Sequence, residues 1–131
     1  MKAKVKSFED LDVHQKLCEL HLEVNRLSLS FPKFELHELG SQIRRSSNSI
    51  AANIAEGWNN KHINIYLEGI NRAQAELQET KHHLYVACQK RYLSEEAYKT
   101  YSERYSECGR MLRGLAQSLQ KWKTAGKRLR P

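Results

Sequence analysis

The chain has 131 residues, the usual size of one domain, and its two prolines and six glycines are too few for a β fold with many turns. No stretch of about 18 apolar residues is present, so no transmembrane span is predicted, and the basic N-terminus leads into no apolar segment of the signal-peptide kind. Three cysteines without CxxC spacing favour a reduced protein, and we expect it to be cytoplasmic.

The net charge of +7 is distributed unevenly along the chain. Residues 1–109 hold 15 basic and 15 acidic residues, whereas residues 110–131 hold seven basic residues and no acid. Those seven are Arg110, Arg113, Lys121, Lys123, Lys127, Arg128 and Arg130. A basic end on a charge-balanced body predicts an anionic partner, although a solvated tail that aids solubility gives the same pattern.

The first predicted helix spans about residues 8–30, and the second spans about residues 35–56. Pro32 ends the first, because the residue before a proline is pushed out of the α region. Gly57 suits the left-handed position that follows a last helical turn, and Gly40 weakens the early part of the second helix, which could begin at Ser41. Apolar residues at helical steps predict the buried faces: Leu11, Leu17, Leu20, Val24, Leu27 and Phe31, then Leu36, Leu39, Ile43, Ile50 and Ile54 with Ser47.

The third predicted helix spans about residues 61–91, and the fourth begins after Ser94, a good N-cap. The buried stripe of the third is Ile63, Tyr66, Leu67, Ile70, Ala73, Leu77, Leu84, Ala87 and Cys88. The fourth carries an unbroken heptad seam that consists of Tyr98, Tyr101, Tyr105, Cys108, Leu112, Leu115, Leu119 and Trp122. Such a seam predicts helices that pack lengthwise at a shallow angle.

Short links between the four segments require each helix to run antiparallel to the next. We therefore expect an all-α fold, an up-down-up-down antiparallel four-helix bundle. It is expected to form a single domain over residues 1–131, with basic ends at 1–6 and 121–131.

The segment "SQIRRSSNSIAANIAEG" (residues 41–57) is unusual because most side chains in the middle of this predicted helix are Ser, Ala or Asn. Two interpretations stay open. The helix packs tightly inside its own bundle, or one small-residue flank contacts a second subunit. The second interpretation predicts an intersubunit contact at Ser46, Ser49, Ala52 and Asn53.

The same segment resembles the signature of a bacterial four-helix-bundle family. The family includes proteins encoded in intervening sequences of large-subunit ribosomal RNA genes and the accessory variability determinant (Avd) proteins of diversity-generating retroelements. Weaker matches are "FEDLDVHQKLCELHLEV" (8–24), "FPKFELHELGSQIRR" (31–45) and "AQAELQETKHHLYVA" (73–87). Two departures are Ala51, where the family often has proline, and His14, where the first helix usually has an aromatic residue.

The resemblance implies a homopentamer with a basic surface that binds RNA or DNA without strong sequence preference. It also implies binding to a reverse transcriptase that copies a template RNA in mutagenic retrohoming. By this resemblance Arg44 and Arg45 are the motif's basic pair and join the predicted nucleic-acid contacts. The alternatives are a ribosomal RNA intervening-sequence protein of unknown role and a protein-interaction bundle without nucleic acid.

No motif in the sequence indicates an enzyme, a cofactor, a metal site or a small-molecule substrate. His82 and His83 point about 100° apart on a helix, and His14 and His21 lie two turns apart, so neither pair suits one ion. The cysteines lie near apolar stripes and are expected to be buried. The tyrosines of the heptad seam are expected in the core rather than as base-stacking platforms. Because no Asn or Gln cluster was seen beside the Arg and Lys residues, contacts to the nucleic-acid backbone alone are predicted.

Overall fold

The computed structural model describes residues 4–125 and contains four α-helices with two short 3₁₀ turns. The 3₁₀ turns are Phe8–Asp10 and Lys33–Glu35, and the α-helices are α1 (Asp12–Ser28), α2 (Leu39–Gly57), α3 (Ile63–Gln89) and α4 (Glu95–Ala125). The described part of the chain has no β-strand. The all-α prediction is therefore confirmed, and the four predicted helices are present with ends that differ by a few residues.

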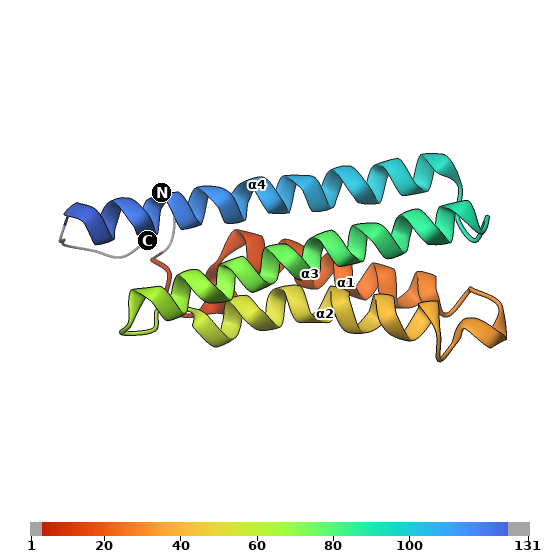
Figure 1. The fold of residues 1–131 in the computed structure, drawn as a ribbon, viewed down its shortest axis with the longest axis horizontal. Coiled ribbons are helices and arrows are strands. Elements are labelled where there is room, and N and C mark those ends of the chain that lie inside the picture. The colour runs from red at the N-terminus through yellow and green to blue at the C-terminus, as the bar shows by residue number, and fades with distance from the viewer. Residues whose placement is uncertain (1–3, 126–131) are drawn as a thin grey trace.

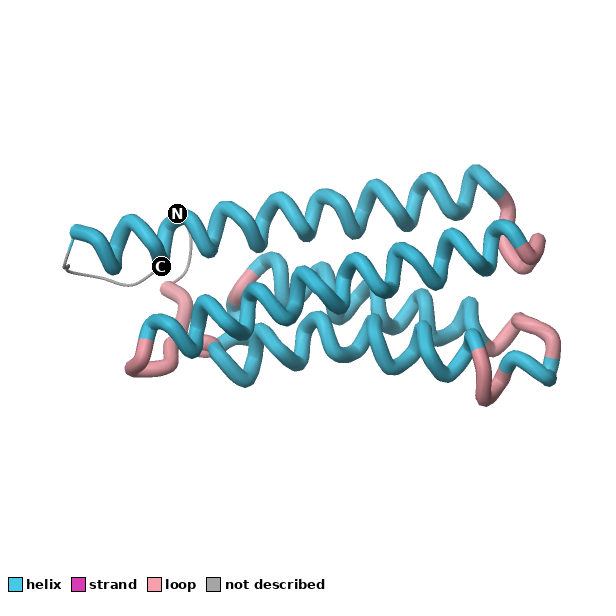
Figure 2. Tube along the Cα trace, in the orientation of Figure 1, coloured by secondary structure: helices cyan, strands magenta, loops and turns pink. Residues whose placement is uncertain are grey.

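The helices run alternately up and down, as the short links between them require (Figures 1 and 2). Helix α1 packs against α2 and α4, and α3 packs against the same two helices. Each helix therefore contacts the one before or after it in the chain, and α1 and α4 close the ring of a four-helix bundle. None of the described helices has a segment long and apolar enough to cross a bilayer.

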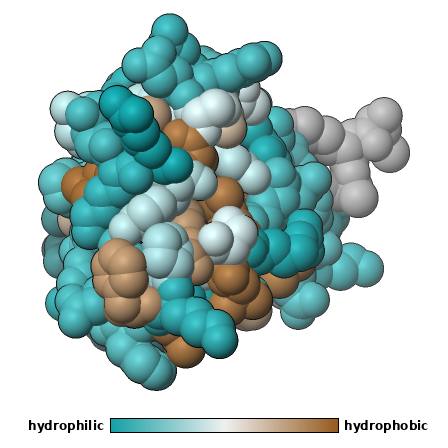
Figure 3. All heavy atoms as spheres, turned by 90° about the vertical axis from the view of Figure 1, so that its right-hand side faces the viewer, coloured by the Kyte–Doolittle hydropathy of each residue, from teal (hydrophilic) through white to brown (hydrophobic). Residues whose placement is uncertain are grey.

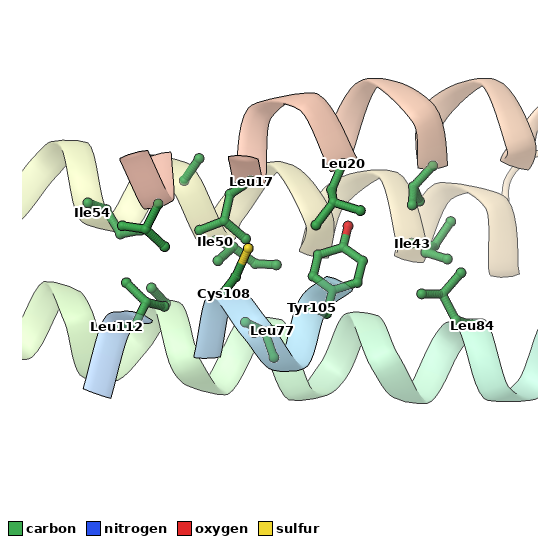
Figure 4. Close-up of a cluster of buried hydrophobic side chains, with 14 of the residues drawn as sticks. Leu17, Leu20, Ile43, Ile50, Ile54, Leu77, Leu84, Tyr105, Cys108 and Leu112 are labelled. Carbon is green, nitrogen blue, oxygen red and sulfur yellow. The ribbon is translucent and has the colours of Figure 1, made fainter. Parts of the chain in front are cut away.

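The predicted apolar stripes meet in one core (Figure 4). Leu17 and Leu20 of α1 and Ile43, Ile50 and Ile54 of α2 are 0–1 % exposed. In the heptad seam of α4, Tyr105, Cys108, Leu112 and Leu119 are buried, and the other four members are half-buried. The seam is thus confirmed as the face that α4 turns toward the bundle.

A buried carboxylate holds the link between α1 and α2 to the link between α3 and α4, which lies at the same end of the bundle (Figure 1). Glu35 is 2 % exposed and accepts hydrogen bonds from Lys90 Nζ (2.8 Å), Tyr92 Oη (2.7 Å) and the Leu39 amide (3.3 Å). The prediction that Leu36 lies on the buried face of α2 is wrong, because the helix begins at Leu39 and Leu36 is 42 % exposed in the link. Leu29 and Phe34 are exposed as well, and hydrophobic atoms gather at this end of the molecule (Figure 3).

The small residues of α2 allow it to approach α3 closely. A Cβ on Gly69 would lie 2.7 Å from the carbonyl oxygen of Asn53 and 3.3 Å from Gly57 Cα, so one of the two backbones would have to shift. Farther along the same contact, Thr80 Oγ1 donates to Ser46 Oγ at 2.8 Å. Ser46 is wholly buried within the chain, which corrects its assignment to an intersubunit contact. Tight packing inside the bundle therefore explains this part of the segment.

Helix α4 is tied to α1 by ion pairs as well as by the seam. Lys16 Nζ lies 2.8 Å from Glu107 Oε1, and Arg104 donates from two nitrogens to Glu23 at 2.7 and 2.5 Å. These neighbouring cations hold the pKa of both Glu107 and Glu23 below the ordinary value. The pairs therefore link α4 to α1 along one side of α4.

Candidate functional site

A groove of about 1030 Å³ runs between α3 and α4, and we call it the α3–α4 groove. Helix α3 contributes Gln74, Leu77, Gln78 and Lys81 to its lining, and α4 contributes Ser106, Gly109, Arg110, Arg113, Ala116, Gln117, Gln120 and Lys121. Both sets recur at helical steps of three and four, so each forms one stripe along its helix. The groove arises where the two stripes face each other beside the seam.

The lining is strongly basic. Its described residues include Lys81, Arg110, Arg113 and Lys121, and none of them is acidic. Leu77, Gly109 and Ala116 are the apolar or small members, and the rest of the lining consists of four glutamines and a serine. Four cations lie close together in the α3–α4 groove, and no carboxylate among the described lining residues offsets their charge. The resulting positive potential favours an anionic ligand.

Within residues 4–125, two of the four cations have partners. Lys81 Nζ donates to Ser106 Oγ at 2.7 Å, which links the two sides of the groove. Arg110 Nη2 lies 3.0 Å from Glu103 Oε1, but both side chains are more than half exposed. An exposed ion pair of this kind is weak, so an incoming phosphate can compete for Arg110.

The predicted basic residues therefore fall into separate groups. Arg110, Arg113 and Lys121 come together in the α3–α4 groove. Lys123 lies on the same helix but donates to Asn64 Oδ1 at 2.8 Å, outside the groove lining. Lys127, Arg128 and Arg130 lie outside the described residues.

The basic pair of the 41–57 segment is placed elsewhere. Arg44 Nη1 donates to Ser28 Oγ at 3.0 Å and Nη2 donates to the Leu36 carbonyl at 2.6 Å, so its guanidinium fastens the α1–α2 link. Arg45 is 59 % exposed and lies 2.6 Å from Glu79 Oε2. Neither residue lines the α3–α4 groove. Arg44 instead stabilises the α1–α2 link, a role that the sequence did not predict.

The remaining members of the predicted intersubunit set differ in exposure. Ala52 is exposed on the outer side of α2, and Ser49 and Asn53 are half-buried. Asn53 Nδ2 donates to the Ser49 carbonyl one turn earlier at 2.8 Å. A small-residue surface available to another molecule is thus centred on Ala52.

Two groups of groove residues were not predicted from the sequence: Lys81 and the glutamines. Lys81 comes from α3, and only the alignment of α3 with α4 brings it beside Ser106, which is 25 residues away in the chain. The glutamines contradict the expected lack of an amide cluster. Gln117 and Gln120 lie between Arg113 and Lys121 in the sequence, so their helical spacing could have predicted that they share a face with these cations. Gln74 and Gln78 come from α3 and join them only in the folded chain.

Other reactive side chains are poorly placed for chemistry. Burial raises the pKa of the Cys108 thiol to about 11 and raises that of Cys18, so both are held as thiols rather than nucleophilic thiolates. Burial also lowers the pKa of His14, His21 and His83. Within residues 4–125, no group of three or more His, Cys, Asp or Glu side chains is arranged to hold a metal ion.

The bundle and its 41–57 segment are shared with a known protein family. The model of a family described as "23S rRNA-intervening sequence protein" matches residues 9–114, which covers α1, α2, α3 and most of α4. The chain belongs to the 23S rRNA-intervening sequence protein family. The resemblance inferred from residues 41–57 is therefore confirmed at the level of the family.

A solved structure supports the membership of the 23S rRNA-intervening sequence protein family. It is the crystal structure of a protein of unknown function from the S23 ribosomal protein family of Bacteroides thetaiotaomicron. The two chains are 26 % identical, the match covers 79 % of this chain and 97 % of the other, and the TM-score is 0.69. The comparison with curated proteins finds no match. The family description names no enzymatic activity, and the function of the solved relative is unknown.

Proposed function

We propose that this protein is a non-enzymatic nucleic-acid-binding protein whose main contact is the α3–α4 groove. The observation that carries the proposal is the groove's lining of four cations without an acidic residue. Arginine and lysine side chains bind nucleic acid mainly through its phosphates, and binding releases condensed counterions. The basic end beyond Lys121 would continue the same contact.

The biological role proposed for this binding is that of an Avd-like accessory protein, which binds a reverse transcriptase and its RNA in a diversity-generating retroelement. This step rests on the family resemblance. The alternative is a ribosomal RNA intervening-sequence protein with a different role, and the family description agrees with this alternative. The gene's neighbourhood tests the two: a reverse transcriptase gene with a template and variable repeat pair supports the first, and a ribosomal RNA gene supports the second.

A homopentamer is part of the same proposal. The exposed small surface around Ala52 supports a contact with another copy, because small side chains let helices approach closely. Several copies would present several grooves to one nucleic acid, so individually weak phosphate contacts would add up through avidity.

The binding test is fluorescence anisotropy of a labelled mixed-sequence RNA, titrated at several salt concentrations. The variant combines Arg110→Gln, Arg113→Gln and Lys121→Gln. Binding should weaken, and the slope of log affinity against log salt should become less steep by about two, because each phosphate contact on a single strand contributes about 0.7 to that slope.

A matched control removes the same charge from other surfaces through Arg26→Gln, Lys33→Gln and Lys99→Gln, all exposed. It should bind much more tightly than the groove variant. Equal weakening by both variants would mean that net charge alone drives binding. A further variant with Lys123, Lys127, Arg128 and Arg130 all changed to Gln leaves every groove cation in place and so separates the basic end from the groove.

A further inference from the structure

We infer that the α3–α4 groove is built for single-stranded nucleic acid, with its glutamines in contact with unpaired bases. The inference rests on the proposed nucleic-acid binding and specifies the kind of strand that is bound. It differs from a contact made only to phosphates, which a duplex could satisfy equally well.

The first argument is the position of the amides. Gln74 and Gln78 lie on the α3 side, and Gln117 and Gln120 lie on the α4 side, so amides line both walls. Each glutamine offers two donors and an acceptor, which match the polar edges of bases. In a duplex the Watson–Crick edges are already paired, whereas a single strand can turn these edges toward the protein.

The second argument is the shape of the groove. Its small or apolar lining, which includes Gly109 and Ala116, leaves space between the two helices. A double helix is too wide to enter the space between neighbouring helices and would touch only the rim, but a single strand can lie along the groove. From Ser106 to Lys121 the α4 stripe is about 22 Å long at 1.5 Å per residue. That length suits a site of about four nucleotides, at the small end of known single-strand sites.

The third argument is the distribution of charge. Lys81 and Arg110 lie near one end of the α4 stripe, Arg113 is in its middle, and Lys121 is at the other end. Cations spaced along the length can follow a single phosphate backbone. The exposed guanidinium planes of Arg110 and Arg113 can also stack on unpaired bases. They are the planar side chains suited to this role, because no aromatic residue is among the described members of the lining.

The experiment compares the parent protein's affinity for a short mixed-sequence single-stranded RNA with its affinity for the blunt duplex of the same sequence. Anisotropy is measured at one fixed salt concentration, and single-stranded and duplex DNA are run in parallel. The single strand should bind at least about tenfold more tightly, a difference of about 1.4 kcal/mol.

The glutamine variant combines Gln78→Ala, Gln117→Ala and Gln120→Ala, all exposed positions whose loss leaves the charge unchanged. It should lose most of the preference for the single strand and keep the parent's salt dependence. The control, Gln42→Ala with Gln89→Ala, changes exposed glutamines outside the groove and should keep the preference.

The outcomes separate the two proposals. If no nucleic acid binds, the proposed function itself fails. If the duplex binds as tightly as the single strand, nucleic-acid binding stands and the single-strand inference falls. If the preference persists in the glutamine variant, the assignment of the amides is overturned. Crosslinking of 4-thiouridine-labelled RNA gives a second measurement, and it should map to residues 74–81 and 106–121.

Discussion

Tyr105 shows how much the surroundings of a single residue matter in this bundle. Its side chain in the seam is wholly buried, and its hydroxyl oxygen points toward Leu20 (Figure 4). Within the described part of the chain this hydroxyl has no hydrogen-bond partner. Burial raises the pKa of Tyr105 far above the ordinary value, so the group stays neutral. Tyr92 is the opposite case, because its hydroxyl donates to Glu35.

Replacing each tyrosine by phenylalanine tests this difference. Tyr105→Phe should keep or raise the free energy of unfolding, by up to about 1–3 kcal/mol, because a buried hydroxyl without a partner is destabilising. Tyr92→Phe should lower it, because Glu35 loses a hydrogen bond. Urea unfolding followed by circular dichroism measures both. A large loss of stability in Tyr105→Phe would contradict the placement of its hydroxyl.

Among the elements, the closest pair is α2 and α3, whose backbones meet at Gly57 and Gly69. Helix α4 is the contrast, because a Cβ on Gly114 would have no atom within 4 Å of it beyond its own stretch of helix, among the residues that the structure describes. The two glycines therefore have different reasons for being in a helix: Gly69 makes room for a neighbour, and Gly114 has no such neighbour.

Gly69→Ala should lower the free energy of unfolding by about 1–3 kcal/mol, because the new methyl group would force two backbones apart. Gly114→Ala should raise it by about 0.5–1 kcal/mol, because alanine loses less conformational freedom than glycine in a helix. Thermal and urea unfolding of the two variants give the comparison. Stabilisation by both substitutions would show that α2 and α3 are farther apart than described.

The whole molecule should lose stability in two steps as pH falls. Burial holds the pKa of His14, His21 and His83 below the ordinary 6.5, so the unfolded chain takes up protons first. Stability is therefore complete above about pH 7 and declines as pH falls through the histidine range. Glu23, Glu35 and Glu107, whose pKa values are lowered from 4.5, add a second loss at lower pH.

Urea unfolding between about pH 7.5 and pH 4, at one protein concentration, measures this profile. His83→Gln should reduce the first step and leave the second. A constant free energy of unfolding down to about pH 5 would contradict the burial of the histidines.

The proposed assembly belongs to the same scale. Light scattering should give a mass near five times 15.3 kDa at micromolar concentration. Ala52→Trp should weaken the assembly while the isolated chain keeps its helical spectrum, because Ala52 is exposed and its side chain supports no core contact. Lys99→Trp places the same bulk on an exposed position of α4 and serves as the control. A monomeric parent would remove the pentamer from the proposal.

The sequence by itself determined the helices, their order and most of the core. Helical periodicity is a local property, so residues such as Leu17, Ile50 and Leu112 could be assigned to the buried side from spacing alone. The 41–57 segment likewise identified the family, because its pattern lies within one continuous stretch.

Only the tertiary structure decided which side chains meet across helices. Lys81 reaches the groove because α3 and α4 align it with Ser106, and Glu35 is buried because it meets Tyr92, 57 residues later in the chain. Arg44 faces the α1–α2 link instead of solvent for the same reason. Charge counts and spacing record what each helix carries, but contacts between distant residues depend on how the helices align when the core packs.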